Sequence, residues 1–374
     1  MTRRPFPHNL RVLFYADLHV GDRANGRLYT DMIEAERFIT QLAIDRKVDW
    51  VAFGGDAFKS RNPHDEHKTR WLEARVERSN EFDHHKISEI DLVGNHCRWY
   101  KADNSGHVFE VLEPGRLGAV FANRIHQVAD TQDTFYSTDE RVLWHTLPAQ
   151  VDYDPTCWAF DQPDSISICL FHGMVKGCSL SQEGTVKASE GVPLEVLDRS
   201  EFDFVMCADI HLPQMLDFKN TQGGYVGSTL QLDATDVGEK RGVLIVTFEK
   251  GATEAAVEFV PVPQAELKVL LWDATAELPD LEPYRGHLVT MKITNASALS
   301  SIEISEKIAI VRDAARYLTT SVESSDPGRA LNSESSISYA DPIDDFVAYL
   351  GQVPNVGLDR QTRVLEILRE VISV

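Results

Sequence analysis

The sequence has no long apolar segment and few cysteines. No apolar run in its 374 residues approaches the ~20 residues that a membrane-spanning helix requires. The basic start, Met-Thr-Arg-Arg-Pro, is not followed by the apolar core of a signal peptide. The 5 cysteines are odd in number and lack C-x-x-C spacing, so we expect reduced thiols and no zinc knuckle. These absences predict a cytoplasmic protein that does not contact a membrane.

Positive charge is also scarce. The chain has 37 Lys and Arg residues against 58 Asp and Glu residues, which gives a net charge of -21 and a pI near 5.0. A protein that binds nucleic acid by itself usually carries a basic face. The balance therefore favours a non-nucleic substrate or a partner that supplies basic surface, although bound divalent cations would offset several carboxylates.

The sequence does contain five short polar motifs close to the ends of apolar runs. They are Asp17-Leu18-His19, Gly55-Asp56, Gly94-Asn95-His96, His172-Gly173 and Asp209-Ile210-His211. The short apolar runs before them are typical of buried strands, which we expect at residues 10–15, 50–53, 90–93, 166–171 and 202–207. Residues 31–46 and 65–86 lie between the first three runs and are predicted to be helices. This alternation predicts an α/β layer architecture.

The motifs supply carboxylate, amide and imidazole groups, which are metal ligands. Strand ends that meet at one edge of a sheet would bring these groups together. Two divalent metals that share one carboxylate are a standard device for cleaving phosphate esters. A mixed oxygen and imidazole set points to Mn²⁺, Fe or Zn²⁺ more than to Mg²⁺. Each motif alone could be an ordinary structural feature, such as an Asx turn. The five motifs together, in this order, favour a metal site.

The order and spelling of the motifs resemble the signature of calcineurin-like metallophosphoesterases. Residues 11–248 more narrowly resemble the repair-nuclease branch that includes bacterial SbcD. The matching segments are residues 16–19, 55–58, 60–63, 210–214, 225–228 and 240–245. The resemblance implies a metallophosphoesterase β-sandwich flanked by helices, together with a small α+β capping domain and a C-terminal helix.

The resemblance also implies a role for each motif residue. The first metal would be held by Asp17, His19 and His211, and the second by Asn95, His172 and Asp209, with Asp56 bridging the pair and His96 as the catalytic residue that is not a ligand. The metals would be two divalent ions, Mn²⁺ first, with Mg²⁺, Fe and Zn²⁺ as alternatives. Arg61 and Arg98 lie next to the motifs and are the candidates for substrate binding.

Three residues depart from the pattern of the family. The closing motif is commonly Gly-His-x-His, and Asp209 stands at the first histidine, which would change the metal preference. Cys97 replaces a residue that is commonly acidic, and Lys59 stands where a histidine often follows the Gly-Asp motif. In repair nucleases that histidine bears on exonuclease activity.

The resemblance and the composition divide the chain into four parts. Residues 1–262 would form the nuclease domain, and residues 263–320 would form the capping domain that holds DNA. In this second region we expect strands at 257–271 and 286–293 and a helix at 302–319. Residues 321–338 are rich in Ser, Asp, Glu and Asn and are predicted to be a linker. Residues 339–374 would form a partner-binding helical segment. Its apolar stripe at 359–374 would pack either on its own domain or on another chain.

Three function classes remain. The first is a metal-dependent DNA exonuclease or endonuclease that works in DNA end processing or recombination with an SbcC-like ATPase, and a homodimer is compatible with this assignment. The second is a phosphatase or small-molecule phosphodiesterase of the same superfamily, which the acidic charge favours. The third is a metal-binding scaffold without activity, and the complete motif set argues against it.

Overall fold

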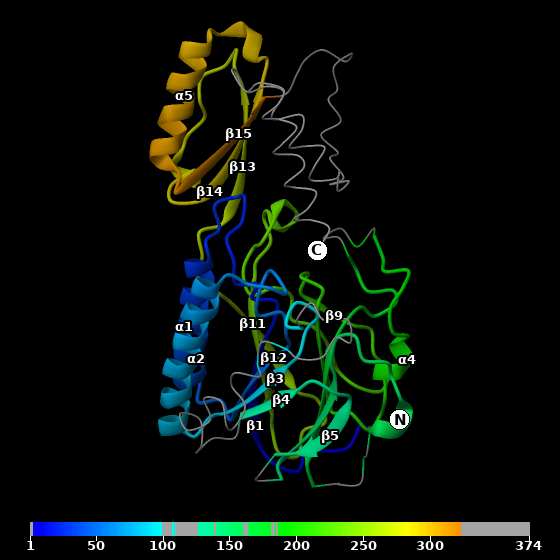
Figure 1. The fold of residues 1–374 in the computed structure, drawn as a ribbon. Helices are drawn as coiled ribbons and strands as arrows, with labels where there is room; N and C mark the ends of the chain where they lie inside the picture. Colours follow the sequence, from blue (N-terminus) through cyan, green and yellow to red (C-terminus); the bar gives the residue numbers. More distant parts are fainter. Residues whose placement is uncertain are drawn as a thin grey trace, which may run out of the picture. The chain divides into compact units, whose positions relative to one another are not determined.

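A computed structural model of the chain describes residues 3–98, 107, 109, 126–137, 140–158, 160, 164–180, 184 and 186–322. Within these residues the strands form two six-stranded sheets and one three-stranded sheet (Figure 1). The first sheet has the order β12 (Ala256–Pro261), β11 (Gly242–Phe248), β1 (Leu10–Tyr15), β2 (Trp50–Phe53), β3 (Ser88–Leu92) and β4 (His126–Ala129). The second has the order β5 (Asp133–Tyr136), β6 (Val142–Leu147), β7 (Ile166–His172), β8 (Phe204–Ala208), β10 (Gly223–Tyr225) and β9 (Gln214–Met215).

The two large sheets pack face to face and form a β-sandwich. Their inner faces share one hydrophobic cluster of buried side chains. Within it, the ring of Phe14 on β1 stacks on Phe204 of β8 with the centroids 5.8 Å apart. Trp50 on β2 meets Trp144 of β6 edge-on at 5.2 Å. The β-sandwich implied by the family resemblance is therefore present.

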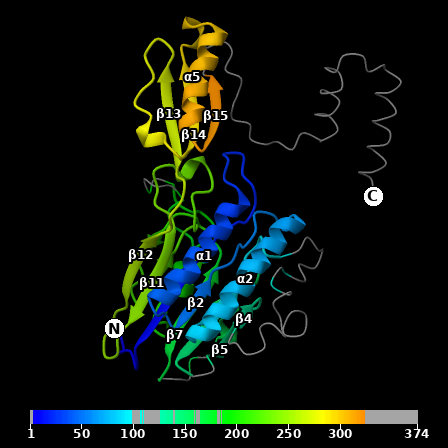
Figure 2. The same ribbon diagram turned by 90° about the vertical axis from the view of Figure 1, so that its left-hand side faces the viewer.

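Two long helices cover the outer face of the first sheet (Figure 2). They are α1 (Tyr29–Asp45) and α2 (Asp65–His85), and both begin and end within two residues of the predicted bounds. Because β2 is covered by the helices on one face and by the second sheet on the other, all four of its residues are buried. This explains why the strand appears in the sequence as a continuous apolar run. The short helix α4 (Leu194–Leu197) lies beside the second sheet.

The strands that lead into the motifs run parallel to one another within each sheet. β1, β2 and β3 are parallel neighbours in the first sheet, and β7 and β8 are parallel neighbours in the second. We expected several of these strand ends to meet at one edge of a sheet, and in the structure they are divided between the two sheets. The first three motifs follow strands of one sheet, and the last two belong to the other. Apolar runs alone do not show which sheet a strand joins, because that depends on long-range pairing.

The third sheet has a hydrophobic cluster of its own. It consists of β13 (Leu267–Asp273), β14 (Leu288–Thr294) and β15 (Tyr317–Val322), with the helix α5 (Ser301–Ala314) packed on it. The helix predicted at 302–319 was too long, because α5 ends at Ala314 and the chain then enters the edge strand β15. The segment from Tyr317 onward is rich in aromatic and β-branched residues, which favour a strand. The single predicted strand at 257–271 is two strands, β12 and β13, in different sheets.

Short 3-10 helices connect several of these elements. They are η2 (Pro155–Cys157), η3 (Ala234–Asp236), η4 (Glu282–Tyr284) and η5 (Ala296–Ala298). The predicted linker beyond residue 322 and the predicted C-terminal helix lie outside the described residues. Among the described helices, none has the length and apolar character needed to cross a membrane. All five cysteines are free thiols, as expected.

Candidate metal centre

The first two motifs lie side by side beyond the ends of β1 and β2. The backbone N–H of Asp17 donates to the Gly55 carbonyl at 3.0 Å, and that of His19 donates to the Asp56 carbonyl at 2.9 Å. Asp17, His19 and Asp56 have φ angles of 51°, 50° and 59°, and Asp209 has 90°. Such left-handed conformations are uncommon for residues other than glycine and tend to cluster at functional sites. Four motif residues therefore share a backbone strain that local sequence does not require.

Two motif glycines allow the loops to approach one another closely. A Cβ atom on Gly94 would lie 2.2 Å from Oδ1 of Asp56, and one on Gly55 would lie 2.7 Å from Nδ1 of His172. Gly55 also has a φ of +109°, which a side chain would strain. Any other residue at these positions would displace the carboxylate or the imidazole.

The carboxylate of Asp56 lies between histidines that come from the two sheets. Its Oδ2 is 3.7 Å from Nε2 of His19, and its Oδ1 is 3.5 Å from Nε2 of His172. The backbone N–H of His96 donates to Oδ1 at 2.9 Å, which fixes the orientation of the carboxylate. Three groups of motif residues have ligand atoms within 4.8 Å of one another, namely Asp17, His19 and His211; His19, Asp56 and His96; and Asp17, Asp56 and His172. A fourth such group joins His211 to Asp233 and Asp236, which lie outside the motifs.

His172 is oriented as a metal ligand would be. Its Nδ1 donates to the Gly54 carbonyl at 2.7 Å, which leaves the lone pair on Nε2. That nitrogen accepts a hydrogen bond from the Asn95 amide nitrogen at 3.1 Å and lies 3.8 Å from Oδ1 of Asp209. The ring therefore presents an unprotonated nitrogen to the side chains of Asn95 and Asp209.

Acceptor atoms of the motif residues converge in the centre, and this fits a cation. Nε2 of His19 and Nε2 of His211 are 3.1 Å apart. Oδ1 of Asp17 is buried and has no hydrogen-bond partner. The Asn95 amide is satisfied by its neighbours, because its nitrogen can donate to Oδ1 and Oδ2 of Asp56 at 3.1 and 3.0 Å. A divalent ion between the imidazole nitrogens and the Asp17 carboxylate would satisfy these atoms, and nitrogen and oxygen ligands suit Mn²⁺, Fe or Zn²⁺.

Burial dominates the electrostatics of the centre. It raises the pKa of Asp17 well above the usual value, and the nearby carboxylates of Asp56 and Asp209 raise it further. It likewise raises the pKa of Asp209. Burial, followed by the neighbouring His211, holds the pKa of His19 well below its ordinary value. The described part of the chain places no arginine or lysine in hydrogen-bond contact with these carboxylates, so a metal ion would supply the missing positive charge.

His96 lies at the rim of the centre. Its Nδ1 donates to the Lys59 carbonyl at 2.8 Å, which orients the ring and leaves Nε2 available. The ring meets that of His19 edge-on with the centroids 5.1 Å apart. Because a nitrogen of His96 lies within 4.8 Å of ligand atoms on His19 and Asp56, its catalytic role stays a prediction, as do the ligand assignments of the other motif residues.

The three departures from the family pattern have clear structural settings. Asp209 approaches His172 and is half-buried, so it can serve where the resemblance implied a histidine. Burial raises the pKa of the Cys97 thiol to about 12, which places a neutral group next to Asp56 instead of another carboxylate. Lys59 points its ammonium group at the Asp22 carbonyl, 2.6 Å away.

The candidate substrate-binding arginines lie in different settings. Arg98 is buried, and its guanidinium donates to the carbonyls of Ala149 at 3.1 Å and Asp130 at 2.9 Å. Arg61 is half-buried on the loop after β2. Substrate binding by either residue stays a prediction. Arg23, whose buried Nε has no hydrogen-bond partner, lies outside the five motifs. Its only signal in the sequence is its position four residues after His19.

Comparisons with known proteins find distant relatives of this chain. No family model matches the chain. The chain is 25% identical over 264 residues to the DNA double-strand break repair protein Mre11 of Methanosarcina acetivorans, an alignment that covers 67% of this chain and 39% of that protein. It is 24% identical over 262 residues to Mre11 of Methanosarcina mazei, with 67% and 38% covered. The chain thus spans about two fifths of the length of these relatives. Among solved structures, a dimetal phosphatase from Danio rerio aligns with a TM-score of 0.41 and 11% identity over 68% of this chain and 99% of that one.

Proposed function

We propose that this chain is a metal-dependent nuclease of the calcineurin-like metallophosphoesterase superfamily, because its five motifs follow the order of that family and its relatives are DNA double-strand break repair proteins. It cleaves phosphodiester bonds of DNA as an exonuclease or endonuclease in DNA end processing or recombination. Two divalent ions, Mn²⁺ in the first place, are its cofactors.

One observation carries the proposal. The carboxylate of Asp56 lies between His19 of one sheet and His172 of the other, at 3.7 and 3.5 Å. A carboxylate flanked in this way is suited to bridge two metals, since each oxygen can serve one ion together with the histidine on its side. A site for a single metal would not need ligand sets on both sides of the carboxylate.

The residues divide into ligands and a proton donor. The first ion would be held by Asp17, His19 and His211 and the second by Asn95, His172 and Asp209, with Asp56 shared. When bound, the pair would supply Lewis-acid polarisation of the phosphate and activation of water. His96, oriented by the Lys59 carbonyl, would donate a proton from Nε2 to the leaving oxygen.

A second candidate is a phosphatase or small-molecule phosphodiesterase, and the net charge of -21 favours it. Fluorescent linear DNA and bis(p-nitrophenyl) phosphate, each with Mn²⁺, Mg²⁺ or EDTA, separate the two. We expect cleavage of the DNA with Mn²⁺ and none in EDTA. Undiminished cleavage in EDTA contradicts metal dependence, and hydrolysis of monoesters alone contradicts a nuclease.

We also propose an SbcC-like ATPase as partner, bound through residues 339–374. The support is the family resemblance and the apolar stripe at 359–374. Deletion of residues 355–374 should remove binding to the ATPase and leave metal-dependent cleavage of short single-stranded DNA. A fall of several degrees in Tm with aggregation would instead mean that the stripe packs on its own domain.

A further inference from the structure

The loop of residues 21–28, which follows the first metal motif, is held firmly in place. The backbone N–H of Arg23 donates to the Arg27 carbonyl at 2.8 Å, and that of Gly26 donates to the Arg23 carbonyl at 3.0 Å, which closes a turn. Tyr317 of β15 covers this turn, since a Cβ on Gly26 would lie 2.1 Å from Cγ of Tyr317. The side chains on the loop are therefore presented by a fixed backbone.

Two arginines on this turn have opposite environments. The guanidinium of Arg27 is buried and donates to the carbonyls of Gln231 at 3.3 Å and Ala265 at 2.6 Å, so it ties the loop to neighbouring segments. Arg23 has a buried Nε without a partner. In the described residues no group accepts a hydrogen bond from its guanidinium. Because no acceptor of the described chain takes its donors, the guanidinium of Arg23 can receive an acceptor from outside the chain.

Contacts place Arg23 on the same rim as the predicted proton donor. The carbonyl of Asp22, next to Arg23 in the chain, accepts the Lys59 ammonium at 2.6 Å. The carbonyl of Lys59 in turn accepts Nδ1 of His96 at 2.8 Å. The rim beside the metal centre therefore carries two cationic side chains, Arg23 and Lys59.

The nearby acidic residues do not occupy Arg23. Burial lowers the pKa of Arg23, and Asp233 and Asp236 oppose this shift. Oδ1 of Asp236, however, accepts the Arg241 guanidinium at 2.6 Å. Oδ1 of Asp233 accepts the backbone N–H of Thr235 at 2.9 Å. These carboxylates lower the net positive charge near Arg23. They accept their hydrogen bonds from other groups, so an anion can still bind to Arg23.

We propose that Arg23, with Lys59 beside it, binds a phosphate of the DNA strand adjacent to the phosphate that is cleaved. The inference rests on the proposed nuclease function and extends it to the length of strand that the site grips. A guanidinium offers paired donors that match phosphate oxygens, and the Lys59 ammonium has donors beyond the one that it gives to Asp22. The fixed loop lowers the ordering entropy of the contact.

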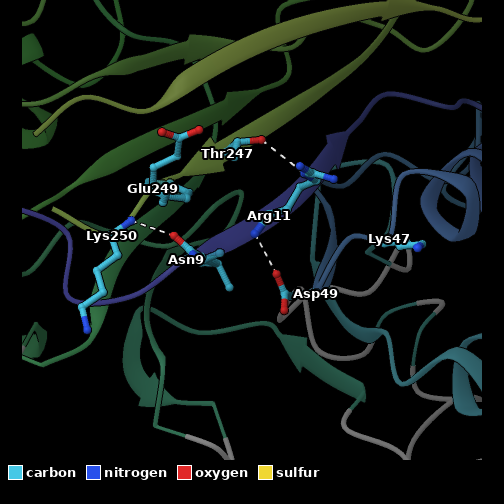
Figure 3. Close-up of a pocket in the computed structure, with 9 residues that line it drawn as sticks. Asn9, Arg11, Lys47, Asp49, Thr247, Glu249 and Lys250 are labelled. Atoms are coloured by element: carbon cyan, nitrogen blue, oxygen red, sulfur yellow. Dashed lines mark hydrogen bonds between the residues drawn. The ribbon is translucent and has the colours of Figure 1, made fainter. Parts of the chain in front are cut away.

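Another hollow, of about 550 Å³, is lined by the basic residues Arg11, Lys47 and Lys250 (Figure 3). It lies where β1 begins and β11 ends. The guanidinium of Arg11 in this hollow is already bonded to Oγ1 of Thr247 at 3.3 Å and to the Arg46 carbonyl at 2.6 Å. Asp49 and Glu249 line the same hollow. It offers no unpartnered buried cation, and its exposed Lys250 provides a control for removal of one positive charge.

The test measures binding and cleavage by the full chain with Mn²⁺. Binding of a fluorescent single-stranded oligonucleotide is followed by anisotropy at several salt concentrations, with His96→Asn as the common background to prevent cleavage. We expect Arg23→Ala to weaken binding about tenfold or more. The slope of log affinity against log salt should fall by about 0.7, the value for one phosphate contact on a single strand. Arg23→Lys should retain part of the affinity, and Lys250→Ala should change neither quantity.

Cleavage kinetics test whether Arg23 contacts a phosphate other than the one that is cleaved. With His96 intact, Arg23→Ala should lower kcat/KM for the oligonucleotide more than for bis(p-nitrophenyl) phosphate, which has a single phosphate. Unchanged affinity and salt slope in both Arg23 variants overturn the inference, and so do equal losses on the two substrates. If the parent chain neither binds nor cleaves DNA, the proposed function itself fails, and the inference fails with it.

Discussion

Two clusters of buried carboxylates lie at the same end of β1 and differ in how their charge is balanced. Under α1 and α2, Arg78 lies 3.1 Å from Glu36 and 3.3 Å from Glu89, and Arg75 lies 2.5 Å from Asp91. In the metal centre, by contrast, the carboxylates of Asp17, Asp56 and Asp209 are paired with no arginine or lysine among the described residues.

The difference shows which acidic cluster is structural and which can hold an ion. Burial tends to lower the pKa of Arg75, but the carboxylates of Asp91 and Glu89 outweigh it, so the pKa is raised well above the usual value. In the metal centre, burial and like charge together raise the pKa of Asp17. The carboxylates of the first cluster have arginine counter-charges within the protein, whereas those of the second would be balanced by a bound cation.

The largest effect should come from the rim of the metal centre. His96→Asn removes the predicted proton donor and should slow DNA cleavage by about 10²–10⁴-fold. Metal content, measured by elemental analysis, should remain that of the parent chain. A loss of metal together with activity would make His96 a ligand and refute the assignment.

Removing a cation from the internally balanced cluster should affect stability instead. Arg75→Met leaves buried carboxylates without their partner and should lower the free energy of unfolding by about 3–5 kcal/mol. Urea unfolding followed by circular dichroism measures the change. Arg70→Met breaks the exposed pair with Glu73, 3.0 Å apart, and serves as the matched control with little expected change. Equal stability of Arg75→Met and Arg70→Met would contradict the contrast between the clusters.

Metal should stabilise the other cluster. Mn²⁺ at 1,000 times its Kd should raise the free energy of unfolding by about 4 kcal/mol, and EDTA should reverse the gain. Asp56→Asn should lose this increment. Without metal it should be at least as stable as the parent chain, because one of the crowded buried carboxylates has been neutralised. Destabilisation of metal-free Asp56→Asn would show that the carboxylate is already balanced.

The smallest effect concerns a buried group that remains neutral. Burial, with a further contribution from Arg199, lowers the pKa of His145 to about 3. In the unfolded chain His145 has a pKa of about 6.5, so below that pH the unfolded chain binds a proton that the folded chain does not. The free energy of unfolding therefore decreases as the pH falls from 6.5 toward 3. Between pH 7 and pH 5 the loss should be about 2 kcal/mol.

His145→Gln should lack this part of the pH dependence, as measured by urea unfolding at each pH. Nε2 of His145 bonds to Oγ of Ser167 at 2.8 Å, and an amide can replace that contact. An unchanged pH profile in His145→Gln would place the titrating group elsewhere.

The sequence predicted the elements that depend on local pattern. Apolar runs located β1 and β2 at their observed bounds, and helical periodicity located α1 and α2 within two residues. The prediction of a single helix at 302–319 failed because the apolar repeat of α5 continues into β15. Only the pairing of β15 within the third sheet distinguishes the strand from the helix. The motif residues were also identified from local pattern, since strand-terminal polar groups are visible in sequence.

The sequence by itself identified the candidate metal ligands and determined which segments form the buried strands, because both follow from residue type and spacing. Only the tertiary structure decided that the ligands come from two sheets and that Asp56 lies between their histidines. It also decided that Arg27 is bonded to carbonyls while Arg23, on the same turn, is left without a partner. The hydrogen-bond partners and the burial of a side chain depend on which segments, distant in the sequence, pack together. The local sequence pattern does not determine that packing.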